Sequence, residues 1–117
     1  MECTNNNFFK DIKKGDTFTG LKMTFYNGTG STKTVMNLTN VKVIIPFKKG
    51  AGQSNAFLFS SEDGTITIPT PANGEIFLQP RDMNYPSFNY IFDVQLITGA
   101  NVKKTYFTNH WKICQDV

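Results

Sequence analysis

Alternating apolar and polar residues predict β-strands along most of this chain. The clearest stretch covers residues 41–47, whose apolar side chains recur at every second position: Val41, Val43, Ile45 and Phe47. A longer stretch, residues 88–97, repeats the pattern with Phe88, Tyr90, Phe92, Val94 and Leu96. Successive side chains of a strand point to opposite faces, so each stretch has one face suited to a core and one suited to water.

Turn residues separate these stretches and predict further short strands. Clusters rich in Gly, Pro, Asn and Asp occur at 27–31, 48–55, 62–64, 71–74 and 99–101. The segments between them predict strands at residues 17–26, 56–60, 65–69, 75–79, 102–108 and 110–114. No segment has the helical period. This pattern predicts an all-β fold, and we expect an immunoglobulin-like antiparallel β-sandwich of about eight short strands.

Two features carry predictions about how particular strands are placed. Phe18 is out of phase with the apolar set that begins at Leu21, a break that a bulge near Gly20 explains. Pro46 lacks a backbone N–H, so we expect the strand of residues 41–47 to end there or to lie at a sheet edge.

Composition agrees with strands and limits the chain to one domain. The 117 residues include eleven Phe, four Tyr and one Trp, and a chain of this length has room for a single core. We predict a sandwich domain over residues 13–117, preceded by a polar N-terminal arm over residues 1–12. The arm carries Phe8 and Phe9, and we expect it to become ordered when it binds a partner.

Candidates for catalytic chemistry are few. His110 is the one histidine, and along a strand it stands about 13 Å from Cys114, too far for proton transfer. Two cysteines and one histidine are too few to hold a zinc ion, and no glycine-rich loop resembles a phosphate cradle. Most acidic residues, such as Glu62 and Asp63, fall in turns or on polar strand faces. We therefore predict no enzyme activity, no metal and no cofactor.

The charge of the chain is mildly basic, with a formal net charge of +3 and a pI near 8.9. Its lysines form short clusters, among them Lys48 with Lys49 and Lys103 with Lys104. We expect these lysines in loops and at sheet edges, where they discourage pairing between sheets, and we expect no nucleic-acid partner. No stretch approaches the roughly eighteen apolar residues that span a bilayer, so no membrane contact is expected.

The two cysteines, Cys3 and Cys114, lie at opposite ends of the chain. The first residues are polar and lack the apolar segment of a secretory signal. We therefore expect two free thiols, with a disulfide between the termini as the alternative.

The order of several motifs resembles a group of phage domains. These motifs are Lys14-Gly15-Asp16-Thr17-Phe18, Asn37-Leu38-Thr39-Asn40-Val41-Lys42-Val43, Ser61-Glu62-Asp63-Gly64-Thr65-Ile66, Gly74-Glu75-Ile76-Phe77-Leu78, Tyr90-Ile91-Phe92-Asp93-Val94-Gln95-Leu96 and Gln115-Asp116-Val117. In this order they resemble the small β-sandwich domain found at the N-terminus of upper baseplate proteins of tailed bacteriophages, and as short stand-alone virion proteins. The resemblance spans residues 13–117.

This resemblance implies a structural protein of the virion, placed in the baseplate, tail or neck and made in the cytoplasm of the host bacterium. It implies repeated contacts with other virion proteins in a homo-oligomeric or ring-like assembly, and it supplies no catalytic residues. Within the arm, Phe8 and Phe9 are the candidate assembly contacts.

Two other functions stay open on the sequence. The first is a carbohydrate-binding module that recognises glycans of the host surface, with Tyr85 and Trp111 as candidate exposed aromatics that stack on sugars. The second is an enzyme built on paired carboxylates, which requires two carboxylates within about 10 Å of each other.

Overall fold

The computed structural model describes residues 9–28, 31 and 33–115. Within these residues the regular structure is almost entirely β-strand, with a turn of 3-10 helix at η2 (Pro71–Asn73). The prediction of an all-β chain is confirmed. No helix in this part of the chain is long and apolar enough to cross a membrane.

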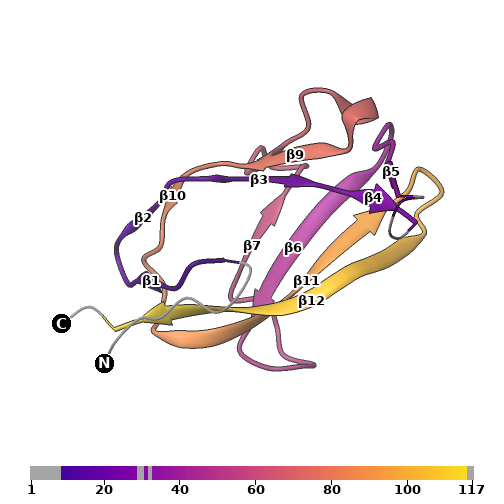
Figure 1. The fold of residues 1–117 in the computed structure, drawn as a ribbon. Coiled ribbons are helices and arrows are strands. Elements are labelled where there is room, and N and C mark those ends of the chain that lie inside the picture. The colour runs from indigo at the N-terminus through magenta and orange to yellow at the C-terminus, as the bar shows by residue number, and fades with distance from the viewer. Residues whose placement is uncertain (1–8, 29–30, 32, 116–117) are drawn as a thin grey trace.

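The largest sheet has five strands and forms one side of the molecule (Figure 1). Its strands, in spatial order, are β1 (Ile12–Lys13), β12 (Lys103–Cys114), β11 (Phe88–Ile97), β6 (Lys42–Lys48) and β7 (Phe57–Ser60). The pairing of β1 with β12 is parallel, and the other three pairings are antiparallel. β1 and β7 are therefore the outermost strands.

Smaller sheets make up the rest of the described fold. Three antiparallel strands form one of them: β3 (Leu21–Thr24), β9 (Glu75–Leu78) and β8 (Ile66–Thr67). Two further pairs are β2 (Thr17–Phe18) with β10 (Arg81–Asp82), and β4 (Tyr26–Asn27) with β5 (Thr34–Val35). Figure 1 shows β3 and β9 on the side of the molecule opposite β11 and β12. The strands are thus divided among several short sheets.

The core lies between these layers and is rich in aromatic rings. Its largest fully buried side chains are Trp111, Tyr90, Phe25, Phe47, Phe59 and Phe92. The alternation of residues 41–47 and 88–97 predicted most of the buried faces correctly, because Val43, Ile45, Val94 and Leu96 are buried as well. Phe88 is the exception, with 41% of its surface exposed. It lies at the start of β11, beyond the last residue of that strand that pairs with β6, Ile91.

Pro46 lies where the sequence did not predict it, because β6 is an interior strand with β11 on one side and β7 on the other. The pairing of β6 with β11 continues on both sides of Pro46 but skips Ile45 and Pro46 themselves. Pro46 has no N–H to donate, and the interrupted ladder requires none there. On its other side Pro46 pairs with Leu58 of β7. The prediction that this strand ends at Pro46 or lies at a sheet edge is wrong.

Strand boundaries also differ from the predictions near Gly20 and along β12. The expected bulge near Gly20 is a full break, since β2 ends at Phe18 and β3 begins at Leu21. Gly20 has a φ of +101°, and a Cβ there would lie 3.0 Å from the carbonyl oxygen of Leu78. The two strands expected at 102–108 and 110–114 are instead one long strand, β12.

Residues 9–12 of the predicted arm pack as part of the domain. Phe9 has 2% of its surface exposed and belongs to the core, and Ile12 and Lys13 pair with the end of β12. The predicted boundary after residue 12 therefore cuts through packed structure, and residues 9–12 belong to the domain. Phe8 lies outside the described residues, so its predicted role as an assembly contact stays a prediction.

Cys114 is disulfide-bonded and almost completely buried. The expectation of a free thiol is wrong for this residue. The other cysteine of the chain, Cys3, lies outside the described residues.

Candidate assembly surface

Side chains seal the β7 edge of the five-stranded sheet. The backbone N–H of Ser60 donates to Oγ1 of Thr65 at 2.7 Å, and Nη1 of Arg81 donates to the carbonyl oxygen of Leu58 at 2.8 Å. An unpaired strand edge normally presents such groups to other chains. At β7 they are already bonded within the molecule.

Arg81 is held in place by aromatic neighbours as well as by its hydrogen bonds. Its Nη2 donates to the hydroxyl of Tyr85 at 2.6 Å, and its guanidinium carbon lies 4.8 Å from the ring centroid of Phe59. The ring of Tyr85 stacks on Phe57 at a centroid distance of 4.2 Å. Tyr85 is therefore half-buried and engaged on its hydroxyl and on a ring face, so it is not the freely exposed ring that the sequence predicted.

The β12 edge on the opposite side of the sheet is paired over only part of its length within the described residues. β1 pairs only with the last two residues of β12, Ile113 and Cys114. Next to these, Nε1 of Trp111 donates to the carbonyl oxygen of Lys10 at 2.8 Å, so the chain before β1 still runs close by at Trp111. From Lys103 to His110, β12 has no strand on its outer side among the described residues. We call residues 103–110 the open edge.

Backbone hydrogen bonds at both ends of β12 fix which backbone groups of the open edge point outward. The N–H of Lys14, which follows β1, donates to the carbonyl oxygen of Cys114, so the polar backbone groups of Cys114 point away from β11. Because these groups alternate along a strand, those of Thr108 and His110 point outward too. On the other side of the Tyr106 bulge, the alternation is set by a different bond. The N–H of Thr98 donates to the carbonyl oxygen of Val102, so the polar backbone groups of Val102 point toward the β11 side. Those of Lys103 and Thr105 therefore point outward.

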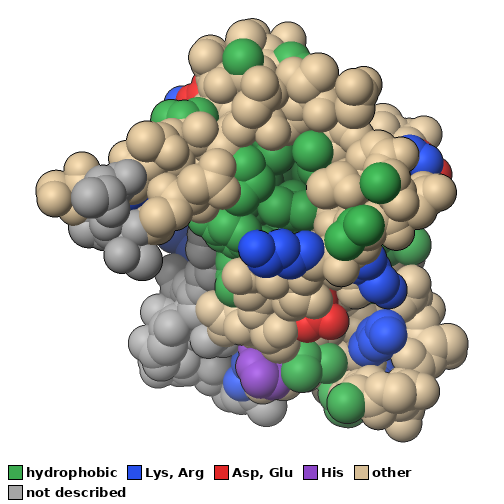
Figure 2. Space-filling view, turned by 90° about the vertical axis from the view of Figure 1, so that its right-hand side faces the viewer, with side chains coloured by type: hydrophobic (Ala, Val, Ile, Leu, Met, Phe, Trp, Pro, Cys, Tyr) green, Lys and Arg blue, Asp and Glu red, His purple; other side chains and the backbone are tan. Residues whose placement is uncertain are grey.

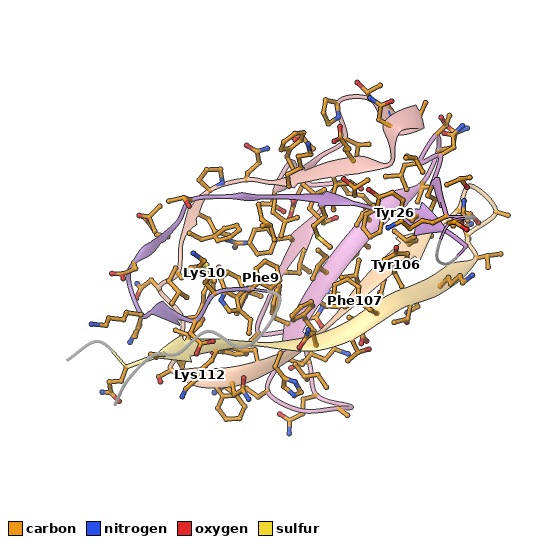
Figure 3. The ribbon with its side chains drawn as sticks, viewed as in Figure 1. Phe9, Lys10, Tyr26, Tyr106, Phe107 and Lys112 are labelled. Carbon is orange, nitrogen blue, oxygen red and sulfur yellow. The ribbon has the colours of Figure 1, made fainter. Side chains whose placement is uncertain are left out.

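Tyr106 is an extra residue in β12, with no partner on β11. Phe107 pairs with Val94 and Thr105 pairs with Gln95, so Tyr106 forms a β-bulge between them. The bulge directs its side chain toward β4. The N–H of Tyr26 donates to the Tyr106 hydroxyl at 3.1 Å, and the Tyr106 ring meets Phe25 edge-on at 4.7 Å. Figure 3 shows Tyr26 and Tyr106 together at one end of the sheet, far from Phe9 and Lys10.

Exposed apolar side chains gather at that end of the molecule. Tyr26, Val35 and Tyr106 are each more than a third exposed, and Nζ of Lys33 lies 4.3 Å from the ring centroid of Tyr26. We call Tyr26, Val35 and Tyr106 the aromatic end. Figure 2 looks onto this side of the molecule, where hydrophobic side chains gather in a central hollow with basic side chains along its lower rim.

The open edge is basic, and its lysines form no ion pair with a carboxylate in the described part of the chain. β12 carries Lys103, Lys104 and Lys112, and the sequence has no Asp or Glu between Asp93 and Asp116. The ion pairs found in the described part of the chain join Lys22 to Glu75 and Lys42 to Glu62. Asp93 of β11 is beside β12, and it accepts a hydrogen bond of 2.6 Å from the Thr108 hydroxyl.

Trp111 and Phe9 do not have the exposure that the sequence predicted. Trp111 has 1% of its surface exposed, because it points into the core on the same face of β12 as Ile113. Phe9 covers it, with ring centroids 4.3 Å apart and planes 14° from parallel. Both residues are core residues, so the predictions that Trp111 is exposed and that Phe9 is available for assembly are wrong.

A cavity of about 400 Å³ lies beside this aromatic pair, between residues 9–12 and 17–21. Asp11, Thr17 and Phe18 contribute to its lining, and Oδ1 of Asp11 is buried without a hydrogen-bond partner. Across the described residues, no group of three or more His, Cys, Asp or Glu side chains is placed to hold a metal ion.

Sequence reasoning missed the open edge. The sequence carries a signal for its charge alone, an acid-free run of residues from Val94 to Gln115. Comparison with protein-family models, with curated proteins and with solved structures finds no match.

Proposed function

We propose that this chain is a structural component of a tailed-phage virion, in the baseplate, tail or neck, and that it acts by protein–protein assembly rather than catalysis. The motif order of the sequence supports the phage assignment. The observation that carries the assembly role is the difference between the two sides of the five-stranded sheet. Side chains seal β7 from within the molecule, whereas residues 103–110 of β12, next to the exposed aromatic end, have no neighbouring strand among the residues that the structure describes.

The open edge and the aromatic end would contribute different kinds of contact to a protein partner. Outward backbone groups of an edge strand can bond to a partner strand, and aromatic side chains supply much of the binding energy in protein interfaces. The partners in this proposal are other virion proteins and further copies of this chain around a ring. The fold is interpreted as an immunoglobulin-like sandwich whose second layer is broken into short sheets.

Mass spectrometry of purified virions tests the proposal. The chain should be present at a constant ratio to known tail proteins, and immunogold labelling should place it on the baseplate, tail or neck. Virions of full infectivity and normal composition that lack the chain would overturn the proposal.

A carbohydrate-binding module is the second candidate. The two rings that the sequence suggests for sugar stacking already contact other side chains: Trp111 is buried, and Tyr85 is stacked on Phe57. The observation that still favours it is the cavity beside Asp11, because an unpartnered carboxylate oxygen can accept a hydrogen bond from a sugar hydroxyl. Binding to host polysaccharides on a glycan array, lost in Asp11→Ala, would support this candidate. A flat array would remove it.

A further inference from the structure

The open edge has features that select one kind of partner, and this inference rests on the assembly role proposed above. We propose that residues 103–110 of β12 receive an extended, acidic segment of a different protein chain, which adds to the five-stranded sheet as a new strand beside β12. The partner is thus defined by its backbone conformation and by its charge.

The backbone of the open edge supplies the pairing groups. The outward N–H and C=O groups of Thr105 and Thr108 have no partner strand among the described residues. Two donors and two acceptors in this arrangement match the main-chain groups of an added strand. The open edge ends before Trp111, because the chain that precedes β1 lies beside β12 at that residue.

The charge of the edge favours an acidic partner. Lys103 and Lys104 are exposed, and neither forms an ion pair in the described part of the chain. Asp93 is the one carboxylate in the adjoining strand β11, and the Thr108 hydroxyl already bonds to it. Carboxylates on an incoming strand would lie across from lysines, and opposite charges on neighbouring strands stabilise pairing.

The same charges disfavour a second copy of this chain on the edge. An antiparallel copy of the open edge would bring no carboxylate opposite Lys103 or Lys104, because the sequence has no Asp or Glu between Asp93 and Asp116. A parallel copy in register would place each lysine beside its equivalent. Like charges directly opposite on paired strands are destabilising, so the occupant that fits is a different, acidic chain.

Two local features restrict pairing further. The Tyr106 bulge interrupts the regular edge, and the N–H of His110 donates to Oδ1 of the neighbouring Asn109 at 2.8 Å. A partner strand must either replace this bond or leave it in place and pair around Thr108. Bulges and occupied donors protect an edge from indiscriminate pairing, which leaves charge as the means of selecting the right partner.

Amide hydrogen exchange followed by NMR tests the inference on the full chain. The probe is the hexapeptide acetyl-Glu-Val-Glu-Val-Glu-Val-amide, compared with its counterpart in which Lys replaces each Glu. At a peptide concentration ten times Kd, the Glu peptide should slow exchange of the Thr105 and Thr108 amides about tenfold. The Lys peptide should leave them unchanged. Equal protection by both peptides, or none by the Glu peptide, would overturn the inference.

Two variants separate backbone pairing from side-chain effects. Thr108→Pro removes an outward N–H and the hydroxyl bond to Asp93 but no backbone bond to β11, so the variant should fold and the protection of the Thr105 amide should disappear. Thr108→Val removes only the hydroxyl, so the protection should remain. Loss of protection in both variants would show that the side chain binds the peptide, against the inference. Protection that grows with the concentration of the chain alone, without peptide, would identify a second copy as the occupant and would also overturn it.

The acidic-strand inference and the virion role can fail independently of each other. If the chain is present in virions and the Glu peptide does not bind, the acidic-strand inference fails and the virion role stands. If virions form normally without the chain, the virion role fails whatever the peptide does.

Discussion

The ring of Phe9 stacks on the indole of Trp111 with centroids 4.3 Å apart. The two residues lie near opposite ends of the sequence, and their contact joins the N-terminal segment to the last strand. Phe9 also meets Phe92 edge-on at 5.1 Å. Residues just before β1 thus complete the core.

We predict that Phe9→Ala strongly destabilises the domain. Truncating a fully buried Phe removes apolar contacts and leaves a cavity, at a cost of about 3–5 kcal/mol in the free energy of unfolding. Urea denaturation followed by Trp111 fluorescence measures this loss of unfolding free energy. Phe88→Ala is the matched control, since 41% of Phe88 is exposed, and it should cost less than about 1.5 kcal/mol. Equal effects of the two substitutions would contradict the assignment of Phe9 to the core.

The contact between Phe9 and Trp111 also shows what the sequence could not predict. Alternation identified the buried faces of β6 and β11, because the two-residue period depends only on neighbouring residues. Burial of Trp111 depends on a segment far away in sequence that covers it. Pro46 likewise gave no local sign of an interior position, since the order of strands in the sheet decides which strand is an edge. The open edge of β12 depends on the same long-range order.

A second prediction concerns Arg81, which seals the β7 edge. Arg81→Met keeps the bulk over Phe59 but leaves the carbonyl of Leu58 without its donor. We expect a loss of about 1–3 kcal/mol in unfolding free energy, the cost of an unsatisfied buried polar group, and a greater tendency to self-associate through the exposed edge. Thermal denaturation and light scattering measure the two effects.

Arg81→Lys serves as the comparison for this prediction. A lysine keeps the charge but cannot bond to the Leu58 carbonyl and the Tyr85 hydroxyl with the geometry of the guanidinium fork. It should therefore also lose stability. Wild-type stability and an unchanged monomer in both variants would show that Arg81 does not seal the edge.

The third prediction concerns Gly74, which supports the aromatic end. Gly74 has a φ of +67°, and a Cβ there would lie 2.6 Å from the carbonyl oxygen of Met36 and 2.7 Å from Cγ1 of Val35. Gly64 also has a positive φ, +84°, but a Cβ at that position would meet nothing within 4 Å. Both Ala substitutions incur about 1–2 kcal/mol of backbone strain, and Gly74→Ala should add about 1–3 kcal/mol from overpacking. Chemical denaturation of the pair tests this difference, and equal losses would contradict the close packing at Gly74.

The fourth prediction concerns the pH dependence of Asp63. The Thr65 hydroxyl donates to Oδ1 of Asp63 at 2.6 Å, and the Thr65 N–H donates to the same oxygen at 2.9 Å. These bonds stabilise the carboxylate and lower the pKa of Asp63 below its ordinary value of 3.8. Stability from this source is present above pH 3.8 and is lost as the pH falls through the lower folded pKa.

NMR titration of the Asp63 carboxyl measures this effect. Thr65→Val removes the hydroxyl bond, so the pKa of Asp63 should rise toward 3.8. Thr67→Val is the control, because Thr67 bonds to Gln79 and not to Asp63, and it should leave the titration unchanged. An Asp63 pKa that is the same in both variants would contradict the assigned cause.

The most direct measurement of the assembly role is a cryo-EM structure of the virion that carries this chain. We predict a strand of another chain along residues 103–110 of β12, with β7 still sealed by Thr65 and Arg81. A map in which this stretch of β12 faces solvent, or in which the partner pairs with β7 instead, would contradict the assembly role proposed for β12.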